Sequence, residues 1–367
     1  MRKLLHTRGE VGARLPRAGI HRVLVCRSVH TLGDSLTLTP LLTELAHTYP
    51  GAEVDIMSGC PIADALYGSF SNVRNVYRLP RHIAGHLLAT VLTLRRMRRQ
   101  HYDLVIDPDL QSQSGRLMAL IARATHTLGY VSPRKSGVVS HGVPPPAELR
   151  HKAKTPVYLL RTALGEDPFA RAFPQPSLGL THAELACGRR TRDRLLEMLQ
   201  TDARGLRIAI FANATRNKLL AHDWWQAFIA SLQQTLPDCR IIEILPAFGA
   251  SMLDDRFPCF YSSDVRKMAA LIANLDAYVS ADCGVMHLAW ASGTPTVGLF
   301  SVTDPAEWGP FGSNADALTL GTATPAQLSQ QTAGLLLHGR TRANHAARNR
   351  GQPITPRSPA KASATPR

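Results

Sequence analysis

Asp282, Cys283 and Gly284 form the turn best suited to hold a charged ligand, because the apolar run of residues 277–280 stops there. The apolar spacing after Gly284 predicts a short helix that ends at the Gly-Thr-Pro of residues 293–295. The first turn of a helix carries free backbone N–H groups and partial positive charge. The sequence therefore predicts a phosphate-binding turn between a strand and a helix.

Each of these residues also has a simpler explanation. Asp282 could only cap the helix, His287 could only be a helical histidine with satisfied hydrogen bonds, and Thr294-Pro295 could only end the helix. Cys283 stands where a thiol pKa can fall, although a small filler residue suits the position better.

Gly33 and Asp34 are a second candidate, at the turn that follows the first predicted strand. Ligands of doubly wound sheets bind beyond the carboxyl ends of the strands, so the Asp34 carboxylate is expected to face the ligand. Its simpler explanation is an N-cap role helped by Ser35.

Several motifs occur together in this chain. D-x-G-x-M-H-L-A begins at residue 282, G-T-P at 293 and T-D-P-x-x-W-G-P at 303, while L-G-D at 32–34 precedes T-x-T-P-L-L. With these motifs the chain resembles glycosyltransferase family 9, the heptosyltransferases that build the lipopolysaccharide core. The resemblance covers about residues 20–338 and is weak between 132 and 180.

The resemblance implies roles for individual residues. Asp34 would be the general base that deprotonates the acceptor hydroxyl. Lys218 would contact the donor phosphates and stabilise the departing diphosphate, a task that Thr215 and Arg216 could share. Met268 would line the nucleotide base, although core packing explains it equally well.

The other donor-binding residues that the resemblance implies lie at the turn and in the loop after the last strand of the motif segment: Asp282, Cys283, Gly284, Val285, His287 and Asp304. Asp304 could bind a sugar hydroxyl or only start its loop. The chain departs from the family at residues 246–251, where many relatives carry a Gly-Gly loop with an acidic residue, and its 27–33 loop is longer by one residue. It has no Asp-x-Asp and no carboxylate cluster suited to Mg²⁺, so metal-independent chemistry without a cofactor is expected.

The elements predicted to position these residues are strands and helices that alternate along the chain. Such alternation indicates a parallel sheet with helices on both faces. Strands are predicted at 23–26, 54–57, 73–77, 104–106, 208–211, 241–245 and 277–280, and helices at 36–49, 83–99, 183–199, 224–236 and 265–274.

The predicted fold class is α/β, with two doubly wound Rossmann-like domains facing a cleft, the GT-B arrangement. We expect a basic N-terminal extension at 1–20, an acceptor-side domain at 21–170, a nucleotide-sugar donor domain at 171–338 and a basic disordered tail at 339–367. Residues 134–156, rich in Ser, Gly and Pro, are expected to form a long loop.

The net charge of +15 is concentrated at the chain ends. Residues 1–27 hold seven Lys or Arg and one Glu, and residues 340–367 hold seven and no acid. The rest is close to neutral, which argues against a nucleic-acid groove. The ends could contact anionic membrane lipid or could be solvated and disordered.

The predicted helix at 83–99 is apolar over most of its length and ends in Arg95, Arg96, Arg98 and Arg99. Such a helix could face a membrane or an acidic acceptor, or its arginines could only complement the helix dipole. The chain has no membrane-spanning run and no signal peptide, so we expect a cytoplasmic protein, with peripheral membrane contact as an option. Its six scattered cysteines predict neither disulfides nor a zinc site.

The sequence thus predicts an inverting, metal-independent glycosyltransferase. It would move a heptose or related sugar from an ADP-sugar donor to a lipopolysaccharide core-type acceptor. Two alternatives stay open: a catalytically quiet GT-B binding protein, which the altered 246–251 loop favours, and a sugar-nucleotide epimerase or phosphorylase on the same architecture.

Overall fold

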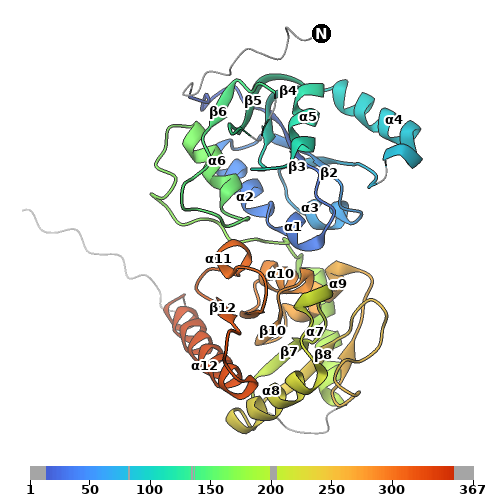
Figure 1. Ribbon diagram of the computed structural model, residues 1–367, viewed down its shortest axis with the longest axis vertical. Helices are drawn as coiled ribbons and strands as arrows, with labels where there is room; N and C mark the ends of the chain where they lie inside the picture. Colours follow the sequence, from blue (N-terminus) through green and yellow to red (C-terminus); the bar gives the residue numbers. More distant parts are fainter. Residues whose placement is uncertain (1–13, 82, 134, 136, 199–204, 351–367) are drawn as a thin grey trace, which may run out of the picture.

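The computed structural model of the protein describes residues 14–350 except 82, 134, 136 and 199–204. Two domains lie one above the other along the long axis of the molecule (Figure 1). The first domain contains β1 (Arg22–Arg27), α1 (Leu32–Leu36), α2 (Thr39–Thr48), β2 (Glu53–Ser58), α3 (Ala63–Tyr67), β3 (Val73–Arg78), η2 (Ile83–His86), α4 (Leu87–Arg98), β4 (His101–Asp107), α5 (Gln113–Ile121), β5 (Arg123–Tyr130), β6 (His141–Val143) and α6 (Thr155–Ala163).

The second domain begins after a connecting segment that has neither helix nor strand. It contains α7 (His182–Glu197), β7 (Arg207–Phe211), η3 (Arg216–Lys218), α8 (His222–Thr235), β8 (Arg240–Ile244), β9 (Cys259–Phe260), α9 (Val265–Ile272), β10 (Ala277–Ala281), α10 (Gly284–Ala291), β11 (Thr296–Phe300), α11 (Pro305–Trp308), β12 (Ala315–Thr319) and α12 (Pro325–Arg350).

Both sheets have six strands, and every strand pair in them is parallel. The strand order is β3-β2-β1-β4-β5-β6 in the first sheet and β12-β11-β10-β7-β8-β9 in the second. Listed from its opposite edge, the second sheet has the order β9-β8-β7-β10-β11-β12, so its strands are arranged in the same way as those of the first sheet. The order therefore reverses between β1 and β4 and between β7 and β10, where doubly wound sheets bind ligands. The predicted α/β fold with two doubly wound domains is confirmed.

The central strands are apolar because helices cover both faces of each sheet. All five residues of β10 are buried, as are all five of β11. In β1 only the first of six residues is exposed.

The helix predicted at 36–49 begins later, at Thr39 as α2, and a separate short helix, α1, precedes it. Thr37 ends α1, and Pro40 lies in the first turn of α2, where its missing N–H costs no hydrogen bond. The prediction of a long loop at 134–156 is also wrong in part, because the segment includes β6 and the start of α6. A three-residue strand with a central glycine carries too little pattern to be predicted.

The expected ends of the domains also differ from the structure. Leu15 and Ile20 are buried, and Leu15 N–H donates to the Ala163 carbonyl at 2.8 Å, so this part of the expected extension packs on the first domain. Helix α12 runs past residue 338, where a disordered tail was expected to begin, and continues to Arg350. Residues 1–13 and 351–367 lie outside the described part of the chain.

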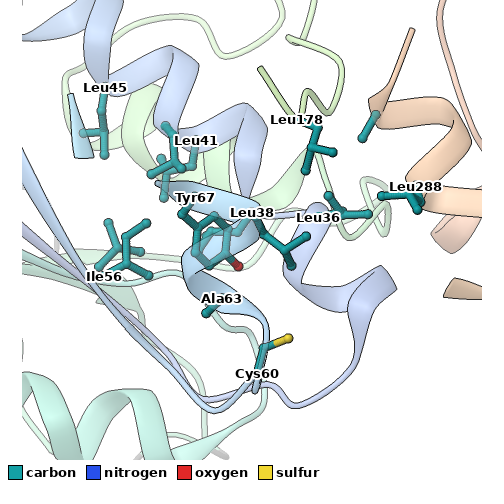
Figure 2. Close-up of a cluster of buried hydrophobic side chains, with 14 of the residues drawn as sticks. Leu36, Leu38, Leu41, Leu45, Ile56, Cys60, Ala63, Tyr67, Leu178 and Leu288 are labelled. Carbon is teal, nitrogen blue, oxygen red and sulfur yellow. The ribbon is translucent and has the colours of Figure 1, made fainter. Parts of the chain in front are cut away.

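The hydrophobic core continues from one domain into the other. Leu36 of α1, Leu178 of the connecting segment and Leu288 of α10 belong to one cluster, and each is fully buried. Figure 2 shows these three side chains close together where the domains meet. The Leu178 N–H also donates to the Ala291 carbonyl at 2.9 Å.

Among the described residues, no helix combines the length and the apolar character needed to cross a membrane.

Candidate functional site

The turn between β10 and α10 leaves the start of the helix without a side-chain cap. Cys283 occupies the N-cap position and provides no capping hydrogen bond. The Asp282 carboxylate is turned elsewhere, since it accepts hydrogen bonds from Lys218 Nζ at 3.1 Å and from Thr303 Oγ1 at 2.5 Å. Asp282 is therefore not an N-cap, and Lys218 is not a solvated loop lysine.

Cys283 fills the space beneath this turn. Burial raises the pKa of its thiol, although the nearby Met286 and Val285 N–H groups oppose that shift. The thiol is therefore neutral at physiological pH, and it is a weak hydrogen-bond acceptor. An anionic ligand would be a far stronger acceptor for the first N–H groups of α10.

Asp34 lies in α1, directly after the carboxyl end of β1. Thr31 caps this helix, because its hydroxyl accepts from the Asp34 N–H at 3.3 Å and donates to Asp34 Oδ2 at 2.6 Å. The N-cap explanation for Asp34 is thus wrong. The half-buried carboxylate lines a cavity of about 280 Å³ with Arg27 and Trp308.

The start of α10 and the Asp34 helix meet across the domain junction. A Cβ atom on Gly33 would lie 2.7 Å from Cδ2 of His287, and one on Gly284 would lie 3.3 Å from Cβ of Leu32. Glycine at position 33 permits this close approach. Figure 1 shows α1 and α10 facing each other where the two domains touch.

His287 lies between the two sets of predicted residues. Burial lowers its pKa to about 4, while the charges of Asp282 and Asp34 raise it and that of Lys218 lowers it. The ring is 3 % exposed, its Nε2 is 3.8 Å from Asp282 Oδ1, and Nδ1 has no hydrogen-bond partner in the described chain. A neutral imidazole with an unpaired buried nitrogen can bind a polar ligand group.

Four other predicted donor-binding residues differ in their exposure to solvent. Thr215 and Arg216 are exposed in the segment after β7, and Arg216 has a positive φ of 56°. Met268 is buried in the core cluster, as core packing alone would predict. Val285 is partly buried and packs against the same cluster.

Asp304 has the second of its two predicted roles, because its side chain stabilises the start of the loop after β11. Its carboxylate accepts from the Ala306 N–H at 2.8 Å and forms an ion pair with Arg150 Nη2 at 3.0 Å. Asp304 therefore ties the loop after β11 to the first domain. Its exposed carboxylate does not join the group formed by Asp282, Lys218 and Thr303.

The segment before α6 was not predicted to be part of the site. It contacts the loop after β11 that contains Trp308, called the Trp308 loop below. His151 Nε2 lies 2.7 Å from the Gly309 carbonyl oxygen, and the Lys152 N–H donates to the Glu307 carbonyl at 3.0 Å. The Lys152 ammonium also lies 5.7 Å from the centre of the Trp308 ring. No local pattern signals these contacts, because they join residues far apart in the sequence.

Arg27 is a further residue of this region for which no role was predicted. It is 6 % exposed, its Nη2 donates to Thr37 Oγ1 at 3.1 Å, and its Nε has no partner in the described chain. The available signal was its position at the end of β1, directly before the Asp34 loop.

A buried ion pair network supports the opposite wall of the Asp34 cavity. Asp107, at the end of β4, accepts from Arg116 Nε at 3.0 Å and from Lys135 Nζ at 2.8 Å. Burial raises the pKa of Asp107, and the two cations oppose this shift. Lys135 Nζ also donates to the Ser112 carbonyl, so the network fixes residues 108–112, which line the cavity.

His151 makes a testable contribution to stability at low pH. Its Nδ1 accepts from the Ala153 N–H at 3.2 Å, so only the neutral ring, with its proton on Nε2, fits both contacts. Burial lowers its pKa to about 4, whereas a histidine in the unfolded chain keeps a pKa near 6.5. The unfolded state therefore binds the extra proton, and stability present above pH ~6.5 is lost as the pH falls to about 4.

The expected loss is about 3 kcal/mol for this one group. Urea unfolding measured between pH 4 and 7 should show a shallower pH dependence in His151→Gln than in the unchanged protein. His47→Gln, which changes an exposed histidine of α2, is the matched control and should leave the slope unaltered. An identical slope in His151→Gln would contradict the role of burial.

No group of three or more His, Cys, Asp or Glu side chains in the described residues is placed to hold a metal ion.

Residues 263–336, which contain α9, α10 and the Trp308 loop, match the family model of glycosyltransferase family 9 (heptosyltransferase). In this segment the chain is similar to the heptosyltransferases of that family. The two parallel, doubly wound sheets are those of the GT-B fold.

No curated protein sequence matches this chain. A family 9 glycosyltransferase of Veillonella parvula has a similar structure, with a TM-score of 0.70 at 15% identity over 89% of this chain and 99% of that one. E. coli heptosyltransferase WaaC with ADP matches with a TM-score of 0.66 at 19% identity, over 87% and 99% of the two chains. E. coli ADP-heptose lps heptosyltransferase II matches at 0.63 and 17%, over 88% and 100%. At these identities the likeness establishes the fold.

Proposed function

We propose that the protein transfers a heptose, or a related sugar, from an ADP-linked donor to a lipopolysaccharide core-type acceptor. The observation that carries the proposal is the group at the start of α10. There Lys218, Asp282 and His287 surround a helix terminus without a side-chain cap, directly across the junction from the Asp34 helix. The similar E. coli structures, heptosyltransferase WaaC with ADP and ADP-heptose lps heptosyltransferase II, support the choice of donor.

The donor diphosphate would lie against the first N–H groups of α10, beside the Lys218 ammonium. Negative charge grows on the diphosphate as the bond from the sugar carbon to its oxygen breaks. Lys218 and the helix terminus supply fixed positive charge at that point, so we propose that no metal ion is needed. Asp282 and Thr303 hold the lysine in place before the donor arrives.

Asp34 would accept the proton of the acceptor hydroxyl while the new bond from oxygen to the sugar carbon forms. The acceptor would enter from the first domain and the diphosphate would leave on the side of the second. Attack opposite to the leaving group inverts the configuration of the sugar carbon. The hydrogen bond from Thr31 orients the Asp34 carboxylate for this step.

The cavity at Asp34 suits an anionic sugar as acceptor. Its lining includes the basic residues Arg27 and Lys152 and the aromatic residue Trp308, together with the acidic residues Asp34 and Asp109. The unpartnered Nε of Arg27 needs an acceptor atom, because a buried N–H without one costs about 1–3 kcal/mol. A carboxylate or phosphate on the acceptor would provide that atom.

The donor is tested by heat protection. The full chain is melted with ADP, UDP, GDP and their sugar conjugates, and we expect ADP compounds to raise Tm most. A ligand at a hundredfold excess over its Kd stabilises the folded state by about 2.7 kcal/mol. ADP release and transfer are then followed with a lipopolysaccharide core acceptor, with and without EDTA, and EDTA should leave the rate unchanged.

The other outcomes separate the alternatives. Protection by UDP compounds alone would overturn the donor assignment, and loss of transfer in EDTA would overturn metal independence. ADP binding without transfer would select the catalytically quiet binding protein. Conversion of the donor without any acceptor would select the epimerase or phosphorylase. A product with retained configuration would exclude the single displacement at Asp34.

A further inference from the structure

Two neighbouring helices of the first domain expose an unusual number of large aliphatic side chains. We call this surface the α4–α5 face, and its members are Leu87 (61 % exposed), Leu88 (74 %), Val91 (41 %), Leu92 (48 %), Leu117 (54 %) and Leu120 (48 %). They are six of the fourteen large hydrophobic residues that are exposed in the described chain. Scattered exposed leucines need no explanation, but a concentration on adjacent helices indicates an interaction site.

The first half of α4 has little contact with the domain core. Thr90 and Met97 are its buried residues, and residues 85–89 are all exposed. Met97 and Met118 of α5 share one core cluster, so both helices cover the same face of the sheet. In Figure 1 α4 projects from the edge of the first domain beside α5. Within the described part of the chain, the leucines at the start of α4 are therefore left exposed.

The chain segment that contains α4 carries basic residues and no acidic ones. Residues 79–102 contain five arginines and no Asp or Glu: Arg81, Arg95, Arg96, Arg98 and Arg99. The last four are exposed at the carboxyl end of α4. Aliphatic side chains next to arginines, with no acid in the segment, are typical of helices that lie at a membrane interface.

We propose that the α4–α5 face docks on the surface of an anionic lipid bilayer. Its leucines enter the boundary of the acyl chains, and the arginines of α4 bind headgroup phosphates. Long arginine side chains can lie along apolar surface and still reach the headgroups. A fluid bilayer accepts protruding side chains without a matching shape, which a protein partner would have to provide.

Docking would also bring the acceptor cavity to the lipid surface. Residues 108–112 line that cavity and lead directly into Gln113, the first residue of α5. An acceptor anchored in the membrane could then reach Asp34 without leaving it. In this respect the inference rests on the proposed function, whereas the docking itself requires no donor or acceptor.

The test is co-sedimentation of the full chain with vesicles of phosphatidylcholine alone or mixed with phosphatidylglycerol. The double variant Leu88→Ser/Leu92→Ser should bind the mixed vesicles about tenfold more weakly, because two side chains no longer partition into lipid. Arg95→Gln/Arg96→Gln should lose binding only on mixed vesicles, and this loss should shrink at high salt. Matched controls in the second domain are Met198→Ser and Arg189→Gln/Arg190→Gln, which should bind as the unchanged protein does.

Thermal melting shows whether each variant is folded, and these exposed positions should leave Tm unchanged. Equal binding by the α4 variants and the unchanged protein would overturn the proposal and assign the binding to the basic chain ends. A dimer in sedimentation velocity that the leucine variant dissociates, with no vesicle binding, would make the face a contact between copies. Transfer to a water-soluble acceptor fragment should be equal in all variants, so failure of docking and failure of the proposed reaction are distinguishable.

Discussion

Replacing Asp34 by Asn is expected to lower kcat for sugar transfer by roughly 10²–10⁴-fold, the contribution typical of a general base. Asparagine has the same shape and can still accept the Thr31 hydroxyl hydrogen bond, but it cannot take a proton from the acceptor. The proposed donor contacts lie on the other side of the junction, so the Kd for ADP should change little. Initial rates of ADP release with acceptor, and calorimetric titration with ADP, provide the two measurements.

The matched control is Asp64→Asn, which neutralises an exposed carboxylate of α3. It should transfer sugar at the rate of the unchanged protein. If Asp34→Asn kept full kcat, another group would have to be the base and the roles assigned to the cavity would fail. Loss of ADP binding in Asp34→Asn would instead indicate that the residue shapes the donor site.

Replacing Lys218 by Met is expected to lower kcat/KM for the donor by about 10²–10³-fold, because one fixed charge at the departing diphosphate is lost. Stability should fall as well, since the Asp282 carboxylate is 5 % exposed and would keep only the Thr303 hydroxyl as partner. Rates with varied donor and Tm of the protein alone measure the two effects separately.

Two further variants separate charge from folding. The double variant Lys218→Met/Asp282→Asn removes the unpaired carboxylate, so Tm should recover while transfer stays slow. Lys218→Arg keeps the charge and should retain more activity than Met. Lys267→Met, at an exposed lysine of α9, is the control and should change neither quantity. Normal donor kinetics in Lys218→Met would remove the lysine from the mechanism.

The sequence was sufficient to predict where in the fold the candidate segments lie. Asp34, Lys218 and Asp282 each follow a buried strand, and parallel strands place their carboxyl ends at one edge of the sheet. The alternation of strands and helices therefore predicted both the fold and the neighbourhood of Lys218 and Asp282. Their ion pair is a direct consequence of adjacent β7 and β10.

Contacts between the domains could not be predicted in the same way. The approach of His287 to Gly33 and the bond from His151 to Gly309 depend on how two separate sheets pack together. Local patterns contain no information on that packing. The cap of α1 was also assigned to the wrong residue, because Thr31 and Asp34 are both good capping residues and only the start of the helix distinguishes them.

The buried contact of Leu36, Leu178 and Leu288 restricts how the enzyme can open and close. Separating these side chains would expose apolar surface to water, which is unfavourable. The two domains should therefore move as a hinge, by rotation about this contact, rather than by separating from each other. Residues beside the pivot, such as Gly33 and His287, would keep their spacing in every state, while side chains farther from it travel.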